Sequence, residues 1–530
     1  MMIFWRRPTG RSDVIADRGI VASSQPLATQ VGLKMLQQGG NAVDAAVATA
    51  ATLDVVEPFS TGCGGDAFAL LHVPGESEPL AFNGSGRAGS LVTLDELRER
   101  GWDRIPVRGG APVTVPGAMH LWHFLISNYG ALDFGTVLSP AIYYAEDGFP
   151  VSPVIAEVWD LLLSALRNET AETIFTIDGR APKPGERMDN PRLARTFREV
   201  AENGISSFYS GAIADSIVET VQEHGGFLKA EDLADHKTEQ TSPISTSYRG
   251  VDIYEHGPNG QGFAALEMLN MMEEFEFSEL DHLSAGRYHI MIEAKKMAYA
   301  DLYQHNADPD FYDVPLGQLL SKQNARKRSK LIKPDKAMDV PESGIDVGTD
   351  TVYLAAADKD GRAISFINSL YMGFGSGLVV PEWGIKLQNR GRLFSLDHDH
   401  PNCYEPGKRP FHTIIPGAAY SNGDLLGVFG IMGGPHQAQA HAQFVSNMLD
   451  YEMSPQEALD HPRFHHDQNS NIVALENGIP PQAQGELRKR GHSIAHETMA
   501  GFGGGQAIFR LRDAWIAGSD FRKDGQAAGF

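Results

Sequence analysis

Cysteine is almost absent from this chain of 530 residues, which contains only Cys63 and Cys403. A disulfide framework and a zinc cluster built from cysteines are therefore excluded, and the scarcity suits a reducing compartment. The first residues, MMIFWRRPTGRSD, are followed by no apolar run of signal-peptide length, and no stretch of about 18 apolar residues occurs anywhere. We therefore expect a cytoplasmic protein that is neither exported nor inserted into a membrane.

Basic residues are also in deficit. The chain has 45 Lys and Arg against 67 Asp and Glu, a formal net charge of −22. Nucleic acid and anionic membrane surfaces bind proteins that can neutralise phosphate charges, and this chain has no basic excess with which to do so. Its 42% hydrophobic and 21% charged residues are ordinary for a globular protein. The composition therefore favours a globular protein with a small-molecule partner.

The common catalytic signatures are missing too. The sequence has no phosphate loop, no dinucleotide fingerprint, no G-x-S-x-G elbow and no H-E-x-x-H. It has instead four glycine-rich clusters: STGCGGD from Ser60, SGRAG around Gly86, MGFGSG from Met372, and IMGG ending at Gly434. Two glycines after an apolar strand can direct consecutive N–H groups at one point, as in an oxyanion hole, although a tight turn explains Gly433 and Gly434 equally well.

The predicted secondary structure changes from mainly helix to mainly strand near Gly348. Before it, helical patterns dominate, at 25–56 with a break at Gly39-Gly40 and Asn41 as N-cap, and at 190–202, 212–223 and 284–303. After it come short β-rich runs, TVYLAAA, AISFINSLY, WGIKL, LLGVFGIMGG and QAIFRLRDAWIAG, with one helix near 437–449. No linker or repeat separates the two parts. A sandwich of sheets covered by helices is the architecture that this pattern favours.

The segment GTDTVYLAAADKDGRAISFINSLYMGFGSG, residues 348–377, resembles the small-subunit start of the gamma-glutamyltransferase family. Members of that family cleave themselves before a threonine that opens a hairpin with a D-x-D-G turn. The likeness extends over nearly the whole chain, in order, through GGNAVDAAVA, TVPGA, EAKKMAYAD, DPDF, GIKLQNRG, GKRPFHTIIP, GIMGG and HPRFHHD.

This resemblance implies an N-terminal-nucleophile hydrolase with a four-layer αββα sandwich of the α+β class. The precursor is expected to be cut between Asp350 and Thr351 into residues 1–350 and 351–530, which stay together as one unit. The resemblance leaves open a homodimer of such heterodimers. Thr351 would be the nucleophile and its freed α-amino group the general base. Taken alone, Thr351 fits an ordinary strand threonine better; the family pattern reverses that judgement.

By the same resemblance, Ser369 replaces the hydroxyl residue that hydrogen-bonds the nucleophile, and Gly433 and Gly434 replace the oxyanion glycines. For Ser369, a structural hydrogen bond to nearby backbone is the alternative. No cofactor and no metal are implied. His398, Asp399, His400 and Cys403 have metal-ligating side chains, but beside Pro401 they fit a surface turn better.

The chain departs from the family where glutamate is bound. An apolar residue near Val92 replaces the carboxylate-binding arginine, and Leu393 replaces the amine-binding acid; Tyr371, His412 and Thr413 replace polar residues of the same wall. Arg87, Arg390 and Arg392 are candidates to hold a carboxylate, although each alone fits a structural arginine. Arg87 is the first choice.

We expect a small carboxylate-bearing amide without an α-amino group, similar to the substrates of oxamate amidohydrolases and cephalosporin-type acylases, because a buried unpaired ammonium costs several kcal/mol. A γ-glutamyl hydrolase or transferase acting on glutathione is the first alternative. A non-catalytic binding module on the same fold is the second.

Overall fold

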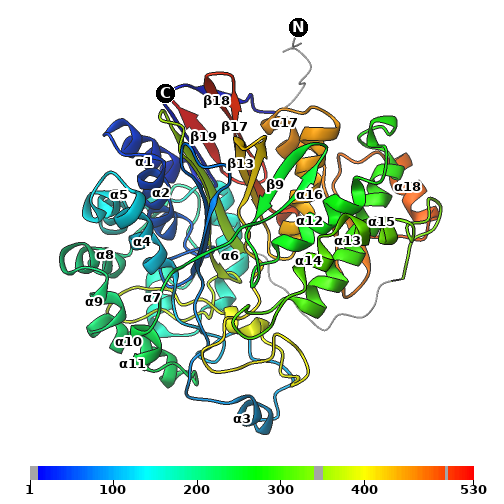
Figure 1. Cartoon of the computed structure of the whole chain (residues 1–530). Helices are drawn as coiled ribbons and strands as arrows, with labels where there is room; N and C mark the ends of the chain where they lie inside the picture. Colours follow the sequence, from blue (N-terminus) through cyan, green and yellow to red (C-terminus); the bar gives the residue numbers. More distant parts are fainter. Residues whose placement is uncertain (1–9, 340–349, 496–498) are drawn as a thin grey trace.

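In this computed structural model, which describes residues 10–339, 350–495 and 499–530, two seven-stranded sheets pack face to face at the centre of the protein (Figure 1). The first sheet has the order β1 (Val14–Ala16), β18 (Ala514–Ser519), β17 (Gly504–Leu511), β13 (Asp424–Met432), β12 (Gly417–Ser421), β9 (Val251–Glu255) and β8 (Ile244–Tyr248). The second has the order β19 (Gln526–Gly529), β2 (Gly19–Ser23), β10 (Asp350–Asp358), β11 (Ala363–Tyr371), β3 (Asp66–His72), β4 (Leu80–Gly84) and β7 (Glu239–Thr241).

The inner faces of the two sheets form an apolar layer between them. Tyr353 on β10 and Ile367 on β11 belong to the same apolar cluster as Val428 on β13 and Ile508 on β17. Gly430 on β13 lies so close to the ring of Tyr353 that a side chain there would overlap it. Side chains alternate between the two faces of each strand, and the side chains on the inner faces interdigitate between the two sheets.

Helices cover both outer faces (Figure 1). Beside the second sheet lie α1 (Pro26–Gln37), α2 (Ala42–Val56), α4 (Ala118–Tyr129), α5 (Phe134–Asp147) and α8 (Pro191–Asn203). Beside the first sheet lie α12 (Gly262–Met272), α13 (Ala285–His305) and α16 (His436–Asp450). Each helical layer shares one large apolar cluster with the sheet that it covers. The expected four-layer αββα sandwich is therefore confirmed.

Smaller elements surround these layers. The remaining helices are α3 (Leu94–Glu99), α6 (Pro153–Leu162), α7 (Glu169–Phe175), α9 (Ser206–Tyr209), α10 (Ala212–Glu223), α11 (Ala230–Ala234), α14 (Leu316–Leu319), α15 (Lys322–Ser329), α17 (Pro455–Asp460) and α18 (Pro481–Lys489). Two small sheets pair β5 (Phe149–Pro150) with β6 (Arg187–Met188), and β15 (Ile472–Leu475) with β14 (Phe464–His466) and β16 (Ser493–Ala495).

Most of the elements expected from the sequence are present, and two expectations were wrong. The break at Gly39-Gly40 separates α1 from α2, and Asn41 caps α2 in a capping box with Asp44. The run WGIKL forms no strand, only an isolated bridge between Val379 and Lys386. The β-rich part also contains α17 and α18 besides the single helix that was expected.

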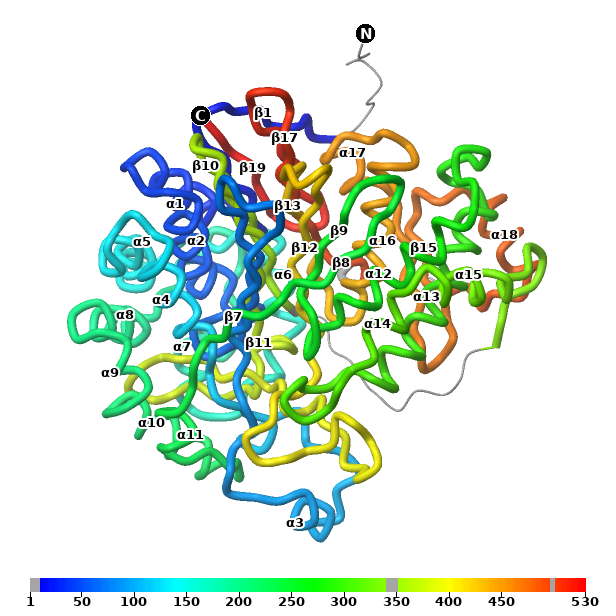
Figure 2. The backbone as a smooth tube through the Cα atoms, in the orientation of Figure 1, coloured from blue at the N-terminus to red at the C-terminus, as the bar shows by residue number. Residues whose placement is uncertain are grey.

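Both sheets combine strands that precede Thr351 in the sequence with strands that contain or follow it. In the second sheet β10 and β11 lie between β2 and β3, and β19 pairs with β2, so the last strand of the chain lies beside the second (Figure 2). In the first sheet β12 pairs with β9, and β18 with β1. Residues on either side of Thr351 therefore share each sheet. Among the described residues, no helix is long and apolar enough to cross a bilayer.

Candidate active site

Thr351 lies near the start of β10, in the middle of the second sheet, and its side chain is buried. The antiparallel ladder between β10 and β11 is regular from Val352 onward but shifts register between Asp350 and Val352. A β-bulge of this kind redirects a side chain out of the regular alternation, and such bulges are common beside active sites. Asp350, the other side of the expected cleavage point, opens the strand.

Ser369 on β11 is the neighbour of Thr351 in this bulge. The two hydroxyl oxygens are 3.0 Å apart. Ser369 Oγ also accepts hydrogen bonds from the backbone N–H of Tyr371 at 2.8 Å and from Nη2 of Arg390 at 3.0 Å. Because these two donors occupy its lone pairs, the Ser369 hydroxyl keeps its own hydrogen to donate, and Thr351 Oγ1 is within reach. This pair can therefore stabilise negative charge that develops on the threonine oxygen.

Arg390 is a fully buried arginine on the short 3₁₀ turn Arg390–Leu393. Besides Ser369, its guanidinium donates to Thr413 Oγ1 at 2.9 Å, and it lies 4.6 Å from the centre of the Tyr371 ring. Tyr371 has φ +79°, a left-handed conformation that non-glycine residues rarely adopt outside strained, functional positions. The structure thus brings four of the expected site residues, Ser369, Tyr371, Arg390 and Thr413, into one contact group with Thr351.

Asp66 and His412 complete the cluster on the far side of Arg390. Asp66 begins β3 and stands opposite Ser369 in the ladder between β3 and β11. Its Oδ1 accepts the N–H of Gly86 at 2.8 Å, while its Oδ2 lies 3.9 Å from Arg390 Nε and 3.8 Å from His412 Nε2. Sequence reasoning missed Asp66, although the motif STGCGGD, which ends in it, was one of the glycine-rich clusters.

Burial dominates the electrostatics of this cluster. It raises the pKa of Asp66 to about 7, against the opposing effects of Arg390, the Gly86 N–H and Arg409. It lowers the pKa of Arg390 to about 10, although Asp66 and Tyr371 act in the other direction. The pKa of His412 falls well below its usual value because of burial and the charges of Arg390 and Arg409. At neutral pH His412 is therefore uncharged and Arg390 is cationic.

Gly433 and Gly434 follow the last residue of β13 and precede α16. Their φ angles are +136° and +56°, a backbone path that glycine adopts without strain. The side chain of Gln261 ties this turn to the cluster, because its Nε2 donates to the carbonyl oxygens of Thr413 and, at 2.8 Å, of Gly434. The N-terminal end of α16 adds a partial positive charge beside the two glycines, which suits a site for an oxyanion.

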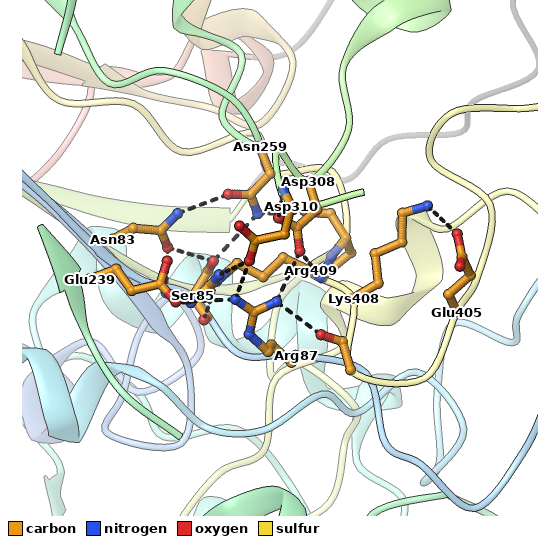
Figure 3. A network of polar contacts seen from close by, with 12 residues as sticks. Asn83, Ser85, Arg87, Glu239, Asn259, Asp308, Asp310, Glu405, Lys408 and Arg409 are labelled. Carbon is orange, nitrogen blue, oxygen red and sulfur yellow. Dashed lines mark hydrogen bonds and ion pairs between the residues drawn. The ribbon is translucent and has the colours of Figure 1, made fainter. Parts of the chain in front are cut away.

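Arg87 lies in a different network, with Glu239, Asp308, Asp310 and Arg409 (Figure 3). Its guanidinium pairs with Asp308 at 3.2 Å, Glu239 at 3.1 Å and Asp310 at 2.7 Å, so three carboxylates already surround it. Arg409 pairs with the same Glu239 at 2.8 Å. Arg390 contacts Ser369, whereas Arg87 is paired with these carboxylates. That Arg87 holds the substrate carboxylate stays a prediction.

The Figure 3 network holds the loop that carries His412 and Thr413. Asn259 Nδ2 donates to the carbonyl of Pro410 at 2.7 Å, and its own carbonyl accepts the N–H of His412 at 2.8 Å. The His412 ring packs edge-on against Phe68 of β3, with centroids 5.2 Å apart. Both contacts orient His412 toward Asp66, and neither was foreseen from the sequence.

The histidines weighed as metal ligands have other partners in the structure. His398 pairs with Asp95 at 2.9 Å, and His400 contacts the carbonyl of Tyr303 at 3.0 Å. Among the described residues, the one group of metal-ligating atoms in mutual reach is His289, Glu293 and His492. Lys296 already neutralises this Glu293 at 2.8 Å, which leaves little negative charge for a cation.

The chain is similar to several known proteins over most of its length. The gamma-glutamyltranspeptidase family profile matches residues 28–530. A glutathione hydrolase-like YwrD proenzyme from Bacillus subtilis is 41% identical over 85% of this chain and 85% of its own length. An oxamate amidohydrolase proenzyme from Klebsiella pneumoniae is 35% identical over 98% and 100%. The crystal structure of a cephalosporin acylase from Bacillus halodurans superposes with a TM-score of 0.93 at 43% identity, covering 100% of this chain and 99% of the acylase.

Proposed function

The chain belongs to the gamma-glutamyltranspeptidase family of amide-hydrolysing enzymes, and on this premise we propose that it is a proenzyme that cuts itself before Thr351 and then hydrolyses a small carboxylate-bearing amide. The observation that carries the proposal is the buried hydroxyl pair of Thr351 and Ser369, 3.0 Å apart in a β-bulge and joined to the cation of Arg390.

Self-cleavage uses the same hydroxyl as turnover. Thr351 Oγ attacks the carbonyl carbon of Asp350, the acyl group moves from nitrogen to oxygen, and water hydrolyses the ester. This leaves a carboxylate on Asp350 and a free α-amino group on Thr351. The α-amine has an ordinary pKa near neutrality, so it can take the proton of the Thr351 hydroxyl when that oxygen attacks a substrate amide. The tetrahedral intermediate then collapses: the C–N bond breaks, and the amine leaves with the proton that the α-amine returns to it. Water hydrolyses the remaining acyl-enzyme and releases the acid.

In this mechanism Ser369 donates to the Thr351 oxygen, and the N–H groups of Gly433 and Gly434 hold the oxyanion of the tetrahedral intermediate. Arg390 binds the substrate carboxylate. Only two hydrogen bonds, each of 3.0 Å, separate Thr351 Oγ1 from Arg390 Nη2. The carboxylate must therefore lie only a few bonds from the scissile carbonyl, which favours an oxamate-like substrate over one with a long spacer.

A γ-glutamyl substrate is the second candidate, and the names of two relatives, the glutathione hydrolase-like proenzyme of Bacillus subtilis and the glutathione hydrolase proenzyme of Escherichia coli, support it. Against it stands Leu393, which lies in an apolar cluster with Tyr371 and Phe411 at the end of the turn that begins with Arg390. An ammonium group beside this side chain would lose its water without gaining a partner, at a cost of several kcal/mol.

Two measurements test the proposal together. Purified protein is expected to give two fragments on a denaturing gel, the smaller beginning at Thr351 by N-terminal sequencing, and Thr351→Ala is expected to give one uncut chain without activity. Ammonia or amine release from oxamate, glutaryl amides and glutathione then ranks the substrates. A different N-terminus, or an uncut wild-type chain, contradicts the proposal; a chain that stays uncut and inactive would favour a binding module.

A further inference from the structure

Three buried polar atoms of the candidate site face one another without a hydrogen-bond partner among the described residues. They are Asp66 Oδ2, Arg390 Nε and His412 Nε2. Asp66 Oδ2 is 3.9 Å from Arg390 Nε and 3.8 Å from His412 Nε2, too far for direct hydrogen bonds but close enough to share one ligand atom. A buried polar atom without a partner costs about 1–3 kcal/mol, so such atoms indicate a place that a ligand completes.

This group is part of the same site as the proposed nucleophile. Asp66 stands directly opposite Ser369 across the ladder of β3 and β11, and the guanidinium of Arg390 reaches Ser369 Oγ through Nη2. Arg390 therefore uses its Nη1 and Nη2 on Thr413 and Ser369, while its Nε edge is directed to Asp66. A carboxylate bound at this edge would lie between Arg390 and Asp66.

We infer that Asp66 determines specificity in this site by taking up a proton when a carboxylate-bearing substrate binds, so that its carboxyl group donates a hydrogen bond to the substrate carboxylate beside Arg390 Nε. This inference rests on the function proposed above. Asp66 binds the substrate carboxylate and takes no part in breaking the amide bond. The proton comes from solvent and returns to it when the product leaves.

The charge balance of the cluster requires this protonation. With Asp66 ionised, its charge cancels that of Arg390, and a second carboxylate would be a like charge only a few ångströms from the first. With Asp66 protonated, the cluster has a net positive charge and presents two donors, the carboxyl O–H and Arg390 Nε–H. Two carboxylates in one site generally share one proton, and the carboxylates of Asp66 and of the substrate would share one here.

The surroundings of Asp66 allow both protonation states near neutral pH. The charged or titratable side chains that interact electrostatically with Asp66 are Arg390 on the 3₁₀ turn, His412 and Arg409 on the loop before β12, and Tyr209 on α9. Arg390 stays cationic, and the pKa of His412 lies well below its usual value. The pKa of Asp66, raised to about 7 by burial, is therefore the side-chain pKa in the cluster that falls between pH 6 and 9. The α-amino group that processing frees on Thr351 also titrates near neutrality, so the contribution of Asp66 is separated from it by substitution.

Calorimetry on the processed wild-type enzyme is the first test of the inference. The probes are pyruvate, which keeps the carboxylate and carbonyl of oxamate but has no amide bond, and glutarate for longer substrates. Comparison of buffers with different ionisation enthalpies should show uptake of roughly three quarters of a proton at pH 7.5 and roughly a tenth at pH 6. The dissociation constant should rise about 25-fold from pH 6.5 to 8.5.

Asp66→Asn isolates the residue responsible. Its amide oxygen can still accept the Gly86 N–H, and its NH₂ group supplies permanently the donor that protonated Asp66 supplies reversibly. The variant should bind the probes with a pH dependence reduced to less than about threefold. Glu267→Gln is the matched control: Glu267 on α12 is another buried carboxyl, with a pKa raised by burial to about 8, and lies 3.6 Å from Arg328. It should keep the wild-type dependence.

The outcomes separate the inference from the proposed function. An enzyme that hydrolyses no amide contradicts the function. An active enzyme that binds both probes without proton uptake, or whose Asp66→Asn form keeps the 25-fold dependence, contradicts the inference alone. So does tighter binding of L-glutamate than of glutarate that strengthens as pH rises, because ionised Asp66 would then be holding an ammonium group. If Asp66→Asn is not processed or melts early, the same calorimetry on uncut Thr351→Ala, which has no free α-amino group at the site, decides: binding of the probes without proton uptake contradicts the inference.

Discussion

At the scale of single residues, the site is a chain of hydrogen bonds that begins at a threonine hydroxyl and ends at a buried ion pair. Thr351, Ser369 and Arg390 are joined by two contacts of 3.0 Å each. Thr351 and Ser369 are short side chains on neighbouring strands, and their positions depend on the backbone alone. The cation of Arg390 therefore acts on the nucleophile through Ser369, as a preorganised donor does in a water-excluded site.

Ser369→Ala is expected to lower kcat by roughly 10²–10³, because it deletes a donor to the Thr351 oxygen, with a smaller effect on KM. Ser369→Thr should retain activity, since it keeps the hydroxyl. Ser365→Ala on the same strand is the control: Ser365 Oγ bonds Tyr353 at 2.7 Å, away from the nucleophile. Steady-state kinetics on the three processed variants checks this, and equal losses in Ser365→Ala and Ser369→Ala would rule out a specific role for Ser369.

Leu393 is expected to exclude γ-glutamyl head groups. We predict that kcat/KM for glutathione is roughly a thousandfold below that for the best carboxylate amide, because the leucine leaves the α-ammonium group unpaired. Leu393→Asp should raise glutathione turnover, and Leu393→Asn, of similar size but uncharged, should not. Glutathione turned over as well as oxamate and glutaryl amides by the wild type would refute this account.

At the scale of elements, the site lies where strands end. Thr351 and Ser369 are at the bulged end of the β10–β11 hairpin, Asp66 begins β3, and Gly433 follows β13. Strand ends combine a rigid backbone with groups that the ladder leaves unpaired. The loop with His412 and Thr413 completes the site, held in place by Asn259 and Gln261.

Gly433→Ala is expected to reduce kcat by about 10² or more while KM changes less, because an alanine cannot adopt φ +136° and the N–H groups of the turn would rotate away from the oxyanion. A Cβ there would also lie 3.2 Å from Gly503 Cα. Gly39→Ala, at φ +96° with no atom within 4 Å, is the control for backbone strain alone. An unchanged kcat in a folded Gly433→Ala enzyme would contradict the assignment of Gly433 to the oxyanion hole.

At the scale of the whole molecule, the cut proposed before Thr351 would not release either part. The two sheets contain strands from both sides of this point in alternation, with β10 and β11 flanked by β2 and β3. Separation would require breaking backbone ladders on both edges of the hairpin and exposing the apolar layer between the sheets. The cut can therefore free an amino group at the site without loosening the fold.

We therefore predict that the two fragments co-elute in size-exclusion chromatography under native conditions and separate only in denaturant. Mass spectrometry of the native peak should give a mass equal to the two fragments together, or to twice that if the heterodimers pair. Thr351→Ala, as an uncut chain, should elute at the same volume. Dissociation of the fragments in dilute native buffer would contradict the interleaved arrangement.

The sequence alone determined the parts of this protein whose signals are local. Caps, breaks and periodicity predicted α1, α2, α10 and α13, because these depend on neighbours within a few residues. The likeness around Thr351 predicted the family and the αββα sandwich. Within the candidate site it predicted Thr351, Ser369, Tyr371, Arg390 and Thr413 as members, and these lie in one contact group.

Tertiary structure decided which distant residues meet. Asp66 is about three hundred positions from Ser369, and only the pairing of β3 with β11 makes them neighbours. The sequence favours Arg87 over Arg390 as the carboxylate anchor. In the structure Arg87 is surrounded by three acids from two distant segments, Glu239 in one and Asp308 and Asp310 in the other. Long-range strand pairing and burial create such contacts and shift the pKa of Asp66, and neither leaves a periodic trace in the chain.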